Sequence, residues 1–94
     1  MYISNILVPH WHLSKHARVR MQQRSIPHCV VSLLIEFASV TEAGGGSSLL
    51  RFNADSWAEA RRTMGGLASK LDRYRNAYVI LAADGAVVTA ARLH

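Results

Sequence analysis

Hydrophobic residues recur at helical spacing in the middle of the chain. Between residues 27 and 38, Val30, Leu33, Leu34 and Phe37 follow one another at intervals of three, one and three positions. This spacing places them on one face of a helix, and Pro27 is suited to the first turn. The pattern predicts a helix over residues 27–38 that is the most buried element of the protein.

The segment before it, "SKHARVRMQQRSI", is more polar but is also predicted to be helical. Ser14 is a good N-terminal cap, and the helix is expected to run from Lys15 to Gln23 or Arg24. Ala17 and Met21, four positions apart, can face the core.

A third helix is predicted after Asn53 or Asp55, either of which can cap it. Gly65 and Gly66 interrupt this segment, and each glycine costs about 1 kcal/mol relative to alanine in a helix interior. The sequence therefore leaves two outcomes open, a continuous helix and a helix broken at this pair. The apolar face of the uninterrupted helix consists of Trp57, Ala60, Met64, Leu67 and Leu71.

Two segments contain runs of β-forming residues on both sides of one or more glycines. "SVTEAGGGSSLLRFN" indicates two short strands joined by a flexible turn. The triple glycine lacks the lysine and the strand-to-helix context of a phosphate-binding loop. "AYVILAADGAVVTAARL" indicates two strands joined by Asp84-Gly85, a pair that favours a two-residue type I′ turn.

That turn fixes an expected register for the last strand. Thr89 is predicted to lie opposite Ile80, on the same face as Val87 and Ala91. Arg92 then falls on the opposite face.

The predicted order is helix, helix, strand, strand, helix, strand, strand. This order indicates an α+β fold, with the N-terminal helices packed on one face of a small antiparallel sheet that ends in a β-hairpin. Ninety-four residues without a linker or repeat are predicted to form a single domain over residues 1–94.

Positive charge is concentrated at the start of the chain. The formal net charge is +5, and residues 1–35 contain four Lys or Arg residues and no Asp or Glu. Such a segment favours a polyanionic partner such as RNA.

The lone Cys29 excludes an internal disulfide and, within an apolar run, is predicted to be a buried free thiol. With no signal peptide or membrane-spanning segment, a cytoplasmic location without membrane contact is expected.

One stripe of the first helix carries residues that could act on a phosphate. His16, Arg20 and Arg24 are four positions apart, whereas Arg18 points away from this stripe. Arginine binds phosphate oxygens in a bidentate manner. In the first turn the helix dipole disfavours a charged imidazole, and a neutral His16 could accept a proton from a 2′-hydroxyl as a general base. The alternative is that this stripe is only a solvated surface.

Two other readings concern the histidines and the aromatic residues. His10, His12 and His16 form an H-x-H-x₃-H pattern that zinc could use, but no acid or cysteine nearby completes the site, so no metal or other cofactor is assigned. The aromatic residues are predicted to belong to the core rather than to stack on nucleotide bases: Trp57, Tyr74 and Tyr78.

The sequence "SKHARVRMQQRSI", together with the closing "YVILAADGAVVTAARL", resembles a bacterial family of uncharacterised small domains. The members carry a His-Ala-Arg helix with Arg-Met-x-x-Arg and a terminal hairpin that contains a threonine. That family is similar to the RelE/ParE and BrnT toxins, which have an RNase-like fold. The central part of the chain does not share the resemblance.

The resemblance implies a RelE-like domain that acts as a metal-independent ribonuclease of a toxin–antitoxin type. The implied catalytic residues are His16, Arg20, Arg24 and Thr89. Further RNA contacts are expected from Lys15, Arg18, Arg51 and Arg92. Family members often have a bulky residue two positions after the threonine, whereas this chain has Ala91.

Three classes of function stay open at this point. The first is the ribonuclease, for which an acidic antitoxin covering the basic helix is the expected protein partner. The second is a non-catalytic module that binds nucleic acid or protein through the first helix. The third is a structural protein that forms a homodimer through the same helix.

Overall fold

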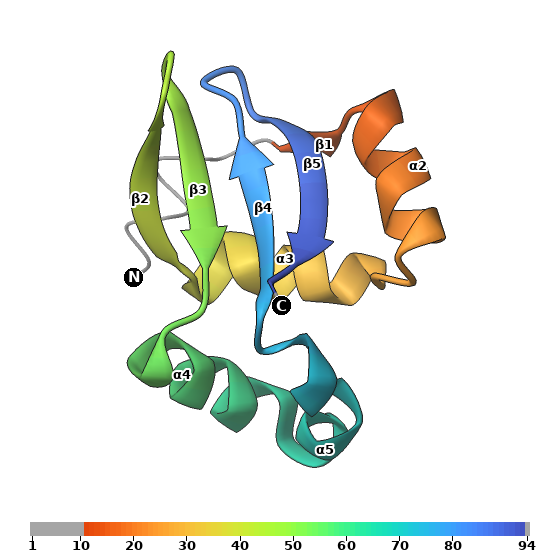
Figure 1. Cartoon of the computed structure of the whole chain (residues 1–94). Helices are drawn as coiled ribbons and strands as arrows, with labels where there is room; N and C mark the ends of the chain where they lie inside the picture. The colour runs from red at the N-terminus through yellow and green to blue at the C-terminus, as the bar shows by residue number, and fades with distance from the viewer. Residues whose placement is uncertain (1–10, 94) are drawn as a thin grey trace.

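The protein has an α+β fold, seen in a computed structural model that describes residues 11–93. Its centre is a five-stranded sheet in the order β1-β5-β4-β3-β2 (Figure 1). The strands are β1 (His12–Leu13), β2 (Ser39–Gly44), β3 (Ser47–Arg51), β4 (Ala77–Leu81) and β5 (Ala86–Arg92). The helices are α2 (Lys15–Gln23), α3 (His28–Phe37), α4 (Ala54–Met64) and α5 (Ala68–Leu71), with short 3₁₀ turns at Gly65–Leu67 and Asp72–Tyr74.

The two N-terminal helices begin and end where the sequence predicts. The backbone N–H of Ala17 donates to Oγ of Ser14 at 3.0 Å, which satisfies one of the free donors at the start of α2. Pro27 is the N-cap of α3, and its fixed φ of −68° suits a helix entrance. The helices pack against the sheet from one side, α2 on β5 and α3 on β3 and β4.

The sheet is mixed rather than purely antiparallel as predicted. The short strand β1, which the sequence analysis does not predict, runs parallel to the start of β5, with His12 beside Ala86 and Leu13 beside Val87. A parallel partner needs a long connection, so no local pattern marks such a strand. The other neighbouring strands are antiparallel.

The glycine-rich segment forms a tight hairpin between β2 and β3, as expected. Gly44 pairs with Ser47, so Gly45 and Gly46 are the two turn residues. Their φ angles of +60° and +82° are those of a type I′ turn, which residues with a side chain rarely adopt.

The connection between β4 and β5 differs from the two-residue turn expected at Asp84-Gly85. Ala82 pairs with Ala86 through a 2.8 Å hydrogen bond, and the N–H of Gly85 donates to the Ala82 carbonyl at 3.0 Å. The loop therefore has a third residue, and Gly85 takes the left-handed φ of +94° that ends such a loop.

An irregularity further along the hairpin restores the expected pairing. The register shifts between Leu81, which faces Val87, and Ile80, which faces Thr89. Thr89 therefore lies opposite Ile80, as predicted. The shift inserts one residue, and Val87 therefore faces the helices whereas Thr89 does not. The prediction that Val87 and Thr89 share a face of the sheet is wrong.

The third helix is capped by Asn53 and ends at the glycine pair. The backbone N–H of Ser56 donates to Oδ1 of Asn53 at 2.8 Å, and the N–H of Asn53 donates to Oγ of Ser56 at 2.8 Å, which forms a capping box. Gly65, with φ of +58°, ends α4. Leu67 lies beyond this break and is 56% exposed, so its predicted place on the buried face is wrong.

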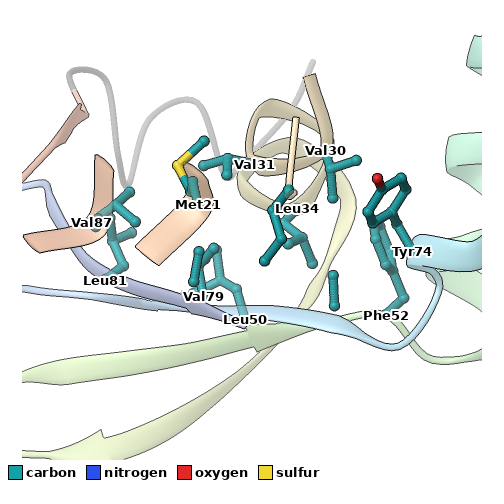
Figure 2. Packing of buried hydrophobic residues seen from close by; sticks show 14 of the residues in the cluster. Met21, Val30, Val31, Leu34, Leu50, Phe52, Tyr74, Val79, Leu81 and Val87 are labelled. Carbon is teal, nitrogen blue, oxygen red and sulfur yellow. The ribbon is translucent and has the colours of Figure 1, made fainter. Parts of the chain in front are cut away.

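The hydrophobic core lies between the sheet and the helices that cover one of its faces. Figure 2 shows sheet residues such as Leu50 and Val79 opposed to Val31 and Leu34 of α3. Cys29 is exposed, not buried as predicted. It lies in the first turn of α3 and is not among the residues of this helix that are buried. No helix in the described part of the chain has the length and apolar character to cross a bilayer.

Candidate nucleic-acid interface

Helix α2 is oriented by the burial of two small or flexible residues against β5. Ala17 is 0% and Met21 7% exposed, which fixes the rotation of the helix about its axis. His16 and Arg24 are consequently exposed and Arg20 is half-buried, so the predicted stripe flanks the buried face. Lys15 and Arg18 on the same helix are also exposed.

His16 and Arg20 contact each other directly. Nε of Arg20 donates to Nε2 of His16 over 3.3 Å, at the surface of the protein. Only an imidazole that lacks a proton on Nε2 can accept this bond. The contact therefore occupies the atom that a general base would use, and Arg20 has to move before His16 can take a proton at that position.

Arg24 bridges the first helix and the sheet. Its Nη1 donates to the main-chain carbonyl of Ala90, 66 positions further along the chain, at 3.1 Å. The two residues of β1 cover only the start of β5, so the later carbonyls of β5 are at a sheet edge. Arg24 caps one of these carbonyls, and its guanidinium is thereby held beside the end of β5.

Arg92 is held at the end of the same strand by two other contacts. Its Nε donates to Oδ1 of Asn76 at 3.2 Å, and its guanidinium carbon lies 5.7 Å from the centre of the Tyr74 ring. Tyr74 is itself anchored, because its hydroxyl donates to the carbonyl of Ser25 at 2.7 Å. A cation over an aromatic face is stabilised by the negative potential of the ring.

These two arginines meet at a cavity. A depression of about 380 Å³ is lined by Arg24, Tyr78, Ala91 and Arg92. Among the described residues, the lining contains two guanidinium groups, one aromatic ring and no carboxylate. The cavity is thus suited to an anion attached to a flat or apolar group.

The remaining predicted residues lie outside this lining. His16 and Arg20 do not belong to it, although Arg24, the C-cap of the same helix, does. Thr89 is half-buried opposite Ile80 on the sheet face that α2 and α3 leave open. None of the hydrogen bonds within residues 11–93 joins Thr89 to the first helix. Of the four predicted catalytic residues, Arg24 therefore lines this cavity, whereas His16, Arg20 and Thr89 are not among its lining residues.

Arg51 lies next to the cavity on the open face of the sheet. It is exposed and pairs with Tyr78, which in turn pairs with Ala91. Within residues 11–93, the ion pair found joins Arg62 and Glu59 on α4, and no ion pair between described residues involves the cationic side chains around this region. Positive charge at this end of the sheet is therefore not neutralised within the described part of the protein.

Two residues of the site are not predicted from the sequence. Asn76 orients Arg92, and Tyr78 lines the cavity although it is predicted to be a core residue. Trp57 and Tyr74 are buried as predicted, whereas Tyr78 is half-buried. The alternation in "AYVIL" does indicate that Tyr78 and Ala77 face opposite sides, but not which side the helices cover.

A zinc site from the H-x-H-x₃-H pattern has no support in the described residues. Within residues 11–93, no three His, Cys, Asp or Glu side chains gather at a distance suited to a metal ion. His10, the first residue of the pattern, lies outside the described residues.

Comparisons with protein-family models, with curated proteins and with solved structures found no match to this chain. The resemblance to RelE-like toxins therefore stays a prediction.

Proposed function

We propose that this protein binds RNA through the basic surface formed by α2 and the end of β5. The observation that carries the proposal is that Arg24, at the end of the helix, and Arg92 of the sheet line one cavity, with no carboxylate among the lining residues that the structure describes. Guanidinium groups match phosphate oxygens in shape and charge, and they remain protonated at every physiological pH. Lys15, Arg18 and Arg20 extend the same positive surface along α2.

Contacts of this kind supply affinity more than sequence selectivity. Each phosphate bound by Lys or Arg releases condensed counterions, so binding weakens as salt rises, with a logarithmic slope of about −0.7 per contact for single strands. RNA binding by this surface is therefore expected to be strongly dependent on salt. RNA binding is also expected to weaken when a positive charge is removed from α2 or from the end of β5, but not when one is removed elsewhere. The reason is that only these two parts of the protein face the RNA.

Fluorescence anisotropy with a labelled 12-nucleotide RNA, titrated at several salt concentrations, tests this function. We expect Arg24→Ala and Arg18→Ala to weaken binding and to reduce the salt slope. Arg61→Ala is the matched control, because it removes the same charge from α4, which lies away from α2 (Figure 1). Equal losses in all three variants would indicate a non-specific effect of net charge, and the proposed surface would then be wrong.

A toxin-type ribonuclease is the second candidate, favoured by the direct contact between His16 and Arg20. An imidazole beside a guanidinium is a pair that could take a proton and stabilise a charged phosphate. In this role Arg20 would leave Nε2 of His16 when a phosphate arrives. An acidic protein that covers α2 would then be the natural inhibitor, because the cations need partners when buried.

Cleavage of a labelled single-stranded RNA in the presence of EDTA separates the two candidates. A ribonuclease should lose about a hundredfold or more of its rate in His16→Ala and in Arg20→Ala, the usual contribution of a positioned acid–base group. Salt-dependent binding without cleavage by the wild type would exclude the ribonuclease and leave the binding function.

A further inference from the structure

The cavity at the end of β5 has features that a simple phosphate-binding surface does not need. Tyr78 is half-buried in its wall and Ala91 lies beside it. These two residues are direct cross-strand partners, so their β-carbons are about 5 Å apart. Because alanine is small, it leaves room next to the tyrosine ring that a larger side chain would fill. The cavity therefore offers an aromatic surface as well as cations.

The cations of the cavity are already fixed in position. Arg24 is anchored on the Ala90 carbonyl and Arg92 on Asn76, each by a single hydrogen bond within the described residues. A guanidinium carries five N–H donors, so most donors of both groups are left for a ligand. Since the anchors hold the two side chains before a ligand arrives, less conformational entropy is lost on binding.

We infer that this cavity is a subsite for one unpaired nucleotide of an RNA strand. The base stacks against Tyr78 above Ala91, and its phosphate lies between Arg24 and Arg92. A volume of about 380 Å³ falls in the range of small-ligand sites. Arg51, the partner of Tyr78 on β3, is placed to contact the phosphate of a neighbouring nucleotide.

The inference deepens the proposed RNA binding, on which it rests, by defining the form of RNA that is bound. In a duplex each base is stacked between its neighbours, and its face is not accessible to a protein side chain. A site that stacks a base therefore selects single-stranded RNA. The arginines alone would bind single and double strands without such a preference, because both present phosphates.

The test compares a labelled 12-nucleotide oligoadenylate with a 12-base-pair RNA duplex as probes for anisotropy. We expect the wild type to prefer the single strand. Tyr78→Leu should weaken binding of the single strand about tenfold, as expected for loss of one stacked base, and leave duplex binding within twofold. Tyr78→Phe, which keeps the ring, should match the wild type. Ala91→Leu, which fills the cavity, should resemble Tyr78→Leu.

Different failures have different meanings. Unchanged single-strand binding in both Tyr78→Leu and Ala91→Leu, with the salt-dependent binding retained, would overturn the nucleotide subsite and leave the proposed RNA binding intact. Absence of binding to either probe by the wild type would overturn both. Circular dichroism shows whether each variant is folded. If Tyr78→Leu does not fold, photo-crosslinking of a 4-thiouridine oligomer to the wild type decides: a crosslink in β4 or the end of β5 is expected, and crosslinks confined to other elements would overturn the subsite.

Discussion

Nη1 of Arg24 donates to the carbonyl of Ala90 across 3.1 Å, and this bond joins the end of the first helix to the edge of the last strand. The two residues are 66 positions apart in the sequence. One side chain therefore has two effects: it caps a carbonyl at a sheet edge, and it supplies a cation to the cavity beside it. A change at this position is expected to alter both stability and RNA binding.

Arg24→Met should lower the free energy of unfolding by about 1 kcal/mol, the net contribution of a typical hydrogen bond. Methionine keeps part of the aliphatic stem but cannot donate to Ala90. Urea denaturation of the wild type and the variant measures the difference. Arg18→Met is the matched control, because Arg18 is exposed on the same helix and its side chain makes no hydrogen bond within residues 11–93; its effect should stay within about 0.5 kcal/mol. Equal effects of both changes would show that the bond to Ala90 contributes nothing to stability.

Asn53→Ala should destabilise the protein by about 1 kcal/mol, because it removes the side-chain half of the capping box at α4. Asn53→Asp keeps an acceptor oxygen for the N–H of Ser56 and adds a negative charge at the helix N-terminus. Thermal or urea unfolding should therefore rank the aspartate variant at or above the wild type. An alanine variant as stable as the wild type would mean that solvent replaces the cap at no cost.

Substitution by alanine should change the free energy of unfolding in opposite directions at the adjacent residues Gly65 and Gly66. Gly65 has a φ of +58°, so Gly65→Ala forces a side chain into a strained backbone and should cost more than about 1 kcal/mol. Gly66 is not among the residues with positive φ, and a β-carbon there meets no atom of the described structure within 4 Å. Gly66→Ala should therefore raise the free energy of unfolding by about 0.4–1 kcal/mol, because it restricts the unfolded chain. Equal urea midpoints for the two variants would contradict this assignment of the backbone.

The helices could be predicted from the sequence because their signals are local. Ser14, Pro27 and Asn53 mark helix starts within one turn of the residues they serve, and Gly65 marks an end. Strand β1 has no such signal, since its only support is a parallel pairing with residues more than 70 positions away. The prediction of a two-residue turn before β5 is wrong, because an Asp-Gly pair also fits the three-residue loop that is found.

The candidate site could be predicted only in its helical part. Spacing by four residues placed His16, Arg20 and Arg24 on one stripe of α2. The contacts that convert Arg24 and Arg92 into a pair are made with Ala90 and Asn76, and such tertiary contacts leave no mark on local periodicity. Tyr78 was assigned to the core because alternation alone does not identify the covered face of a sheet.

His16→Gln should leave RNA binding equal to that of the wild type if this protein is a binding module. Glutamine can still accept the hydrogen bond that Nε of Arg20 donates to His16. Arg20 therefore stays in place beside Lys15 and Arg18 on α2. The measurement is the dissociation constant of the labelled 12-nucleotide RNA, obtained by fluorescence anisotropy.

The same variant separates a binding module from a ribonuclease. Glutamine cannot act as a general base, so a ribonuclease should lose about a hundredfold or more of its cleavage rate in His16→Gln. His28→Gln is the matched control and should keep the wild-type rate, since His28 stacks on Trp11, with ring centroids 5.4 Å apart, rather than joining the stripe of α2. Affinity and cleavage rate measured on the same two variants therefore identify which role His16 has: unchanged affinity without any cleavage assigns it to the binding surface, and a selective loss of cleavage assigns it the role of general base.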